Sequence, residues 1–185
     1  MAQLVTQGAV AYNTHAGFGL ENVTEMAFDY NRAMKYAILA LDSPAQPVAS
    51  RVSLFHVAIE SMRQLDWPLD EQLALANMAM AEYPDQPEFY GERGMILCAM
   101  DRLDEARASL LKAAALYENP EAPPTAETYF TAASAATVYA RLGELEALRQ
   151  NRDAAEAFFR KALVEDESNA AIQEKYECFL RESRS

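Results

Sequence analysis

Apolar residues recur at helical spacing along most of the chain. Between residues 22 and 42 the apolar positions are Met26, Tyr30, Met34, Ala37 and Leu41, which a helix places on one face. Similar stripes predict helices over 54–65, 70–82, 87–100, 103–117, 126–149, 153–165 and 170–181, separated by breaks that contain Pro, Asp or Asn. Strand patterns are nearly absent. We therefore predict an all-α array of helix pairs joined mostly by short turns.

The helix pairs repeat with a period of 34 residues. Residues 87–120 fill one unit, 53–86 fill the unit before it, and 136–169 form a third. Two of these units place Gly at the eighth position and Ala at the twentieth and twenty-seventh; these residues are Gly94, Ala106, Ala113, Gly143, Ala155 and Ala162. Small residues at these positions let the two helices of a unit approach each other closely. One unit cannot bury its apolar face alone, so stacking of units must supply the core.

The motifs that carry this repeat resemble those of the tetratricopeptide repeat (TPR). They are Tyr90-x2-Arg93-Gly94-x2-Leu97 and Tyr139-x2-Leu142-Gly143-x2-Glu146, each followed by an Ala-x3-Leu or Ala-x3-Phe segment. The unit 53–86 departs from the pattern, because His56, Glu60 and Gln72 stand where the family has an aromatic residue, Gly and Ala. The resemblance covers about 53–182. It implies antiparallel helix pairs stacked as a short right-handed superhelix, an α-solenoid.

The same resemblance suggests a domain organisation. Residues 1–52 form an N-terminal extension with one helix packing on the array, and 53–185 form a single domain of three units closed by a capping helix at 170–181. Fifteen residues, 121–135, are inserted between the second and third units. We expect them to lengthen the first helix of the third unit to 126–149, with Thr125 as its N-cap.

Composition narrows the choice of partners and compartment. With 28 Asp and Glu against 16 Lys and Arg, the net charge is −12, which disfavours nucleic acids and anionic membranes. No stretch approaches the roughly 20 apolar residues of a membrane-spanning helix, and the N-terminus lacks the features of a secretory signal. Only Cys98 and Cys178 occur. A reducing compartment, the cytoplasm, is the expected location.

No constellation of residues points to catalysis, a metal or a cofactor. His56 lies on a helix and is expected to pack as a ring in the core, and His15 is expected at the surface. Gly17-Phe18-Gly19 follows no strand and lacks the third glycine of a dinucleotide loop. The pair Glu144 and Glu146 is expected on a solvated helix face, and Cys98 is expected to be a buried thiol.

Proteins of the resembled family bind through a concave surface formed by the first helix of each unit. The residues of this chain at those positions that we expect to bind a partner are Leu54, Val57, Ser61, Glu88, Glu92, Met95, Arg141 and Glu144. Of the Lys, Asn and Arg side chains that hold a C-terminal carboxylate in chaperone-binding members, only Arg141 is matched. An apolar groove with acidic patches is expected to prefer a hydrophobic or basic segment. Alternatively, the chain's own N-terminal segment fills several of these positions.

These observations favour a non-catalytic module that binds a protein or peptide. The alternative is the accessory C-terminal TPR region of a larger enzyme. Thr14-His15-Ala16-Gly17-Phe18, followed by Asn31-Arg32, faintly resembles the stretch that joins a family-2 glycosyltransferase domain to trailing TPR units. This chain has no D-x-D motif and no parallel-sheet pattern, so catalysis would reside elsewhere. Pairing of two copies across a two-fold axis is a third expectation.

Overall fold

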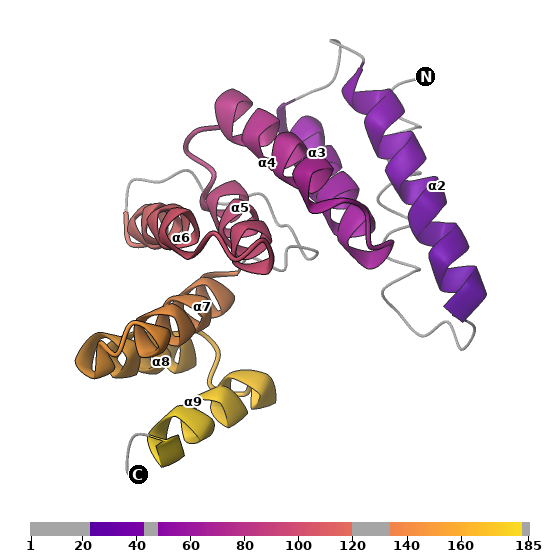
Figure 1. Cartoon of the computed structure of the whole chain (residues 1–185). Helices are drawn as coiled ribbons and strands as arrows, with labels where there is room; N and C mark the ends of the chain where they lie inside the picture. Colours follow the sequence, from indigo (N-terminus) through magenta and orange to yellow (C-terminus); the bar gives the residue numbers. More distant parts are fainter. Residues whose placement is uncertain (1–22, 43–47, 120–133, 183–185) are drawn as a thin grey trace. The chain divides into compact units, whose positions relative to one another are not determined.

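The computed structural model describes residues 23–42, 48–119 and 134–182, all of them in helices or the turns between them. The helices are α2 (Val23–Leu41), α3 (Val48–Gln64), α4 (Leu69–Glu82), α5 (Pro87–Ala99), α6 (Leu103–Tyr117), α7 (Ala135–Leu148), α8 (Arg152–Glu165) and α9 (Ala170–Glu182) (Figure 1). They fall into two compact units, with α2–α4 in unit 1, up to Pro84, and α5–α9 in unit 2, from Asp85 on. The all-α prediction is confirmed for the described ranges, and the grouping of 53–185 into one domain stays a prediction.

In unit 1, α3 packs more extensively against α2 than against α4. Three alanines of α2 meet two larger residues and one alanine of α3, and all six are buried: Ala33, Ala37, Ala40, Leu54, Val57 and Ala58. Alanine at these positions lets the helix backbones come close, and Leu54 and Val57 fill the space between them. The predicted N-terminal helix is therefore part of the core of unit 1.

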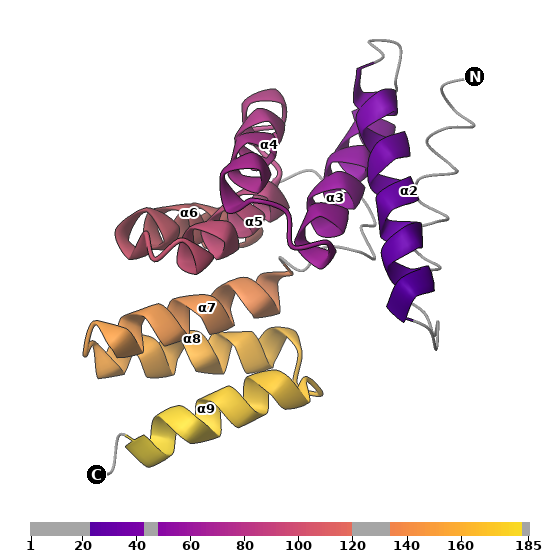
Figure 2. The ribbon, with the colours of Figure 1, turned by 45° about the vertical axis from the view of Figure 1, so that its right-hand side comes forward.

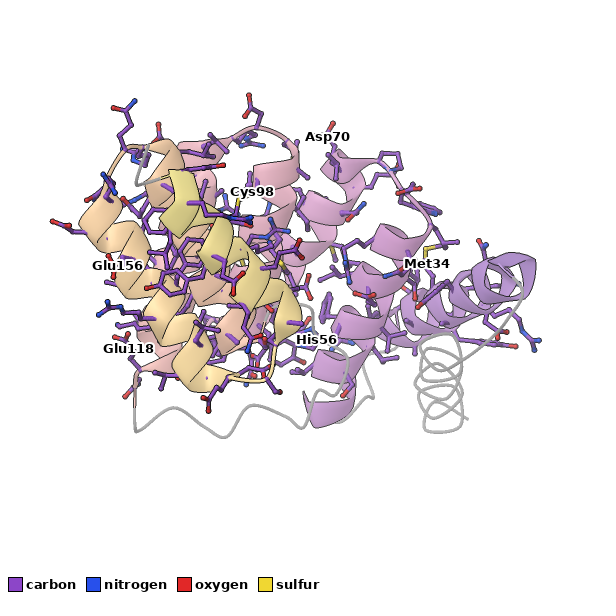
Figure 3. All side chains as sticks on the ribbon, turned by 90° about the horizontal axis from the view of Figure 1, so that it is seen from below. Met34, His56, Asp70, Cys98, Glu118 and Glu156 are labelled. Carbon is purple, nitrogen blue, oxygen red and sulfur yellow. The ribbon has the colours of Figure 1, made fainter. Side chains whose placement is uncertain are left out.

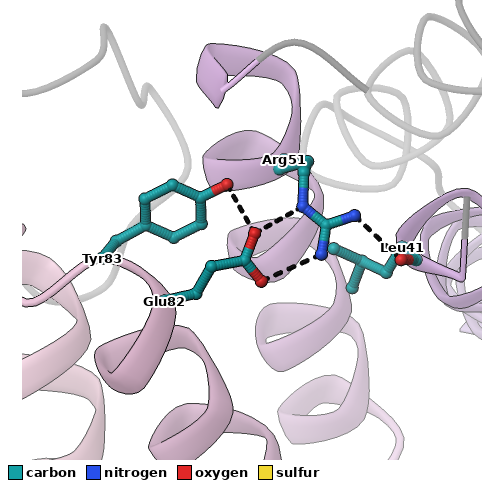
Figure 4. Close-up of polar contacts among 4 residues, drawn as sticks. All are labelled: Leu41, Arg51, Glu82 and Tyr83. Carbon is teal, nitrogen blue, oxygen red and sulfur yellow. Dashed lines mark hydrogen bonds and ion pairs between the residues drawn. The ribbon is translucent and has the colours of Figure 1, made fainter. Parts of the chain in front are cut away.

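Arg51 joins the three helices of unit 1 (Figure 4). Its Nε donates to Glu82 Oε1 at 2.6 Å and its Nη2 to Glu82 Oε2 at 2.9 Å, a bidentate pair between α3 and the last turn of α4. Nη1 donates to the carbonyl oxygen of Leu41 at 2.9 Å, so the same guanidinium satisfies an acceptor at the end of α2. Tyr83 Oη donates to Glu82 Oε1 at 2.8 Å, and this network holds the pKa of Glu82 below its usual range.

In unit 2 the pairs α5/α6 and α7/α8 pack closely where the repeat places glycine. A Cβ on Gly94 would lie 2.6 Å from Leu110 Cγ, and one on Gly143 would lie 2.9 Å from Phe159 Cδ2. Both distances are far below van der Waals contact. Only glycine allows the second helix of each pair to seat its large side chain, as the repeat predicted. Figures 1 and 2 show α7, α8 and α9 side by side at the C-terminal end of this unit.

Three helices end with the same turn. In α3, α5 and α7 the second residue after the end of the helix has a positive φ. These residues are Asp66 (51°), Asp101 (57°) and Gln150 (61°). In each case the next N–H donates to a carbonyl five residues earlier, at 2.9 to 3.0 Å, which closes the helix. The turn after α3, residues 65–68, is one residue longer than its counterparts 100–102 and 149–151.

Two predicted helices were wrong in their start. Helix α3 begins at Val48, six residues before the predicted range 54–65, and α7 begins later than predicted. Helix α7 begins at Ala135, because Ser134 has an extended backbone (φ −60°, ψ 159°) and its Oγ accepts the N–H of Thr137 at 3.3 Å. Such an N-cap fixes the first turn and stops the helix from extending backwards. A continuous helix over 126–149 is therefore excluded, and Thr125 lies outside the described residues.

Candidate interaction groove

A groove of about 430 Å³ lies between α7 and α9 in unit 2, and we call it the α7–α9 groove. Its apolar lining comes from Ala147 and Leu148 of α7, Phe159 of α8 and Phe179 of α9. Leu148 is 69% exposed, although the rings of Phe159 and Phe179 in the same lining are buried. The groove therefore presents apolar surface to solvent on two helices that belong to one compact unit.

The charged groups of the α7–α9 groove are paired with one another. Glu144 accepts a hydrogen bond from Arg141 Nη1 at 2.8 Å on its own helix, and its Oε1 lies 2.5 Å from Lys175 Nζ on α9. Glu182 is the remaining ionic residue of the lining. The groove therefore carries two positive charges, on Arg141 and Lys175, and two negative charges, on Glu144 and Glu182. The ion pair across the groove also ties α9 to α7.

Aromatic rings hold α9 in place beneath this groove. The ring of Phe159 lies 5.7 Å from that of Tyr176 and 5.5 Å from that of Phe179, measured between centroids, and the latter two rings lie 6.4 Å apart. Phe159 and Phe179 are buried with Ala155 in one apolar cluster. Rings at these separations add to the stability that burial supplies, so α9 is an ordered wall of the groove.

Two of the predicted site residues, Arg141 and Glu144, lie together in unit 2. Arg141 and Glu144 line the α7–α9 groove, and their role in binding stays a prediction. Cys98 of α5 lies near enough that both influence its thiol, whose pKa burial raises above the usual range. Cys98 and Met95 are partly exposed on α5, so the thiol is only partly buried.

Two other predicted site residues, Glu88 and Glu92, are buried. Glu92 is 1% exposed and Glu88 is 3% exposed. Together with burial, both carboxylates raise the pKa of Tyr117 on α6, which places them near that ring. Their role in binding stays a prediction, but they present almost no surface to a partner.

In unit 1 the predicted site residues lie beneath other parts of the chain. Leu54, Val57 and Ser61 are at most 1% exposed. Leu54 and Val57 pack against Ala33 and Ala37 of α2. This is the arrangement in which the chain's own N-terminal segment covers concave positions. Binding of a partner by Leu54 and Val57 stays a prediction that would require α2 to move.

Two further titratable residues that the sequence singled out, Glu146 and His56, are buried. Glu146 was predicted to face solvent, and this is wrong: it is 1% exposed and pairs with Arg107 of α6 through Nε and Oε1 at 2.5 Å. Asn151 Nδ2 donates to the other carboxylate oxygen of Glu146, Oε2, at 3.0 Å. His56 packs in the core as predicted, and burial lowers its pKa to about 3.

Lys175 and Cys178 complete the α7–α9 groove and were not predicted as site residues. They lie three residues apart on α9, and this spacing puts them on the same helix face. Sequence reasoning assigned this helix to capping alone. In the described ranges, no group of three His, Cys, Asp or Glu side chains is placed to hold a metal ion. No helix of the described residues is both long and apolar enough to cross a membrane.

Comparisons with known proteins identify the fold. No protein-family model matches the sequence, and no curated protein matches it. The crystal structure of MamA aligns with a TM-score of 0.60 and 13% identity, over 84% of this chain and 80% of that one. TTC0263, a thermophilic TPR protein in Thermus thermophilus, aligns with a TM-score of 0.57 and 18% identity, over 93% and 88% of the two chains. The chain has the TPR fold.

A third TPR-like match is BtubC (BKLC) from P. vanneervenii, with a TM-score of 0.59 and 14% identity, over 99% of this chain and 87% of that one. At these identities the likeness concerns the fold. In a TPR array, stacked helix pairs create extended surfaces that are suited to holding other proteins. The α7–α9 groove is formed by the first helix of a repeat and the closing helix.

Proposed function

We propose that this chain is a non-catalytic protein-interaction scaffold that binds an apolar helical segment of a partner in the α7–α9 groove. The observation that carries the proposal is the exposure of Leu148, at 69%, in a groove of about 430 Å³ whose other apolar walls are Ala147, Phe159 and Phe179. An amphipathic helix recognises such a surface by laying its apolar side chains into it. Burial of Leu148 by a partner would contribute about 1–2 kcal/mol.

The charges of the groove favour an apolar segment over a basic one. Glu144 is paired with both Arg141 and Lys175, so a basic partner would have to displace a cation already in place. Glu92, the other acidic residue on which a preference for a basic segment depended, is buried. The apolar lining is the remaining source of affinity.

The other interpretations receive less support. The comparisons do not support the alternative that this chain is the accessory C-terminal region of a glycosyltransferase. Both cysteines are free thiols, which suits the proposed cytoplasmic location. The proposed partner is a protein or peptide, and the charge of −12 disfavours nucleic acid and anionic membrane surfaces.

A labelled amphipathic helical peptide with leucines on one face and no net charge serves as the probe. Its binding to the full chain is followed by fluorescence anisotropy. We expect Leu148→Glu to weaken binding at least about tenfold, because a carboxylate would be desolvated in the groove. The matched control is Met78→Glu, since Met78 is 61% exposed on α4 and does not line this groove. Equal binding by the two variants, or no saturable binding at all, would contradict the proposal.

A further inference from the structure

A second hollow lies elsewhere in unit 2, around helix α8. It has a volume of about 590 Å³ and we call it the α8 groove. Its walls are the C-terminal end of α6 at Glu118, the ring of Tyr139 on α7, and the face of α8 that carries Ala157 and Val164. It shares no lining residue with the α7–α9 groove. Glu118 and Glu156 lie along the same edge of unit 2 in Figure 3.

The floor of the α8 groove is apolar and open. Val164 is 83% exposed, the largest exposed fraction among the large hydrophobic residues that the structure describes. Ala157 is exposed on the same helix, two turns earlier. Tyr139 contributes its ring, and the Nζ of Lys161 lies 5.4 Å from the ring centroid. A partner side chain placed on Val164 would therefore remove apolar area from water.

Both cations of the α8 groove are engaged by carboxylates of the same groove. Lys161 Nζ lies 2.5 Å from Glu118 Oε1, and Arg160 Nη2 lies 2.5 Å from Glu156 Oε1. Glu118 Oε1 also accepts a hydrogen bond from Tyr139 Oη at 3.2 Å. The positive charges are thus held by their neighbours and do not confer a preference for an acidic ligand.

Asp153 and Glu165 add two more carboxylates to the lining, which gives it four acidic and two basic groups. Burial raises the pKa of the Tyr139 hydroxyl to about 12, and the negative charges of Glu118 and Glu165 add to this shift, so both carboxylates lie near that ring. The acidic excess therefore comes from the two ends of α8, at Asp153 and Glu165. These two carboxylates lie on either side of the apolar floor along the helix.

From this arrangement we infer that the α8 groove is a docking surface for a basic segment of a partner protein, with Lys or Arg on either side of an apolar residue. The apolar residue rests on Val164 and Ala157, and the flanking cations face Asp153 and Glu165. Complementary charge selects such a segment over an acidic one and speeds its association. A second copy of this chain is a poor occupant, because it also carries a net charge of −12.

A short labelled peptide with a central leucine flanked by lysines and arginines is the probe for this surface. We expect saturable binding to the full chain that weakens as salt is raised, because screening reduces the attraction between exposed charges. In Glu165→Lys we expect binding to weaken at least about tenfold and to depend less on salt. The matched control is Glu174→Lys, which makes the same change of charge at an exposed position of α9 outside both grooves.

Three results would overturn this inference. If Glu165→Lys and Glu174→Lys weakened binding of the peptide equally, the peptide would be attracted by the overall charge of the chain and not by the α8 groove. Equal affinity for a peptide in which glutamates replace the basic residues would remove the charge preference, and loss of binding in Leu148→Glu would place the peptide in the α7–α9 groove. The inference is independent of the proposed function, since the neutral apolar probe tests one groove and the basic probe tests the other.

Discussion

Replacement of Gly143 by alanine tests the close approach of α7 and α8. An ideal Cβ at this position would lie 2.9 Å from Phe159 Cδ2 and 3.0 Å from its Cε2 and Cγ atoms. Carbon atoms prefer about 3.5–4.0 Å, so the ring or the helix must shift by at least about half an ångström. The ring of Phe159 is buried and is backed by those of Tyr176 and Phe179, which leaves it little room to retreat.

Two effects of opposite sign set the magnitude. Overpacking of a well-filled core costs about 1–3 kcal/mol, whereas alanine is favoured over glycine in a helix by about 1 kcal/mol. Because three ring atoms are contacted at once, we expect the steric cost to exceed the gain. The net effect of Gly143→Ala should be a loss of up to about 2 kcal/mol in the free energy of unfolding.

Urea denaturation of the full chain, followed by circular dichroism, measures this loss. The control Ala108→Gly, at an exposed position of α6, gives the helix-propensity difference without a steric clash. A double mutant with Phe159→Leu should recover part of the loss from Gly143→Ala, because the ring atoms in the way are removed. If Gly143→Ala stabilised the chain by the amount that helix propensity alone predicts, the close packing of α7 on α8 would be refuted.

Two further predictions concern buried titratable groups. The pKa of His56 is lowered to about 3 by burial, so between pH 6.5 and that value only the unfolded chain takes up the proton. The stability that the neutral, buried His56 contributes is complete above pH 6.5 and falls by about 2 kcal/mol at pH 5. Urea titrations at pH 7 and pH 5 measure this fall, and His56→Phe should lack it. If the variant lost as much stability between pH 7 and pH 5 as the wild type, the prediction would be wrong. Glu146→Ala should lower the free energy of unfolding by about 2 kcal/mol, because it strands Arg107 and the Asn151 amide, whereas Glu144→Ala, at a more exposed position, should cost less than 1 kcal/mol. Equal losses in denaturant titrations of these two variants would contradict the burial of Glu146.

Local patterns determined the helices of this chain. The 3.6-residue periodicity of apolar positions predicted each described helix, and the recurrence of Gly94 and Gly143 predicted where pairs approach. These features depend on neighbours within one helix pair, which lie close in sequence. The predicted start of α7 was wrong because Ser134 caps the helix, and this cap outweighs the helical sequence pattern that continues before it.

Contacts between residues distant in sequence decided the rest. Glu146 is buried because Arg107, 39 residues earlier, lies beside it, and Lys175 reaches Glu144 from a helix that the repeat pattern treats as a cap. Leu54 and Val57 are covered by α2, although their positions match those of a binding surface. The periodicity of a helix tells which of its faces is apolar. Which helix covers that face, and which part of it remains open to a partner, depends on tertiary packing.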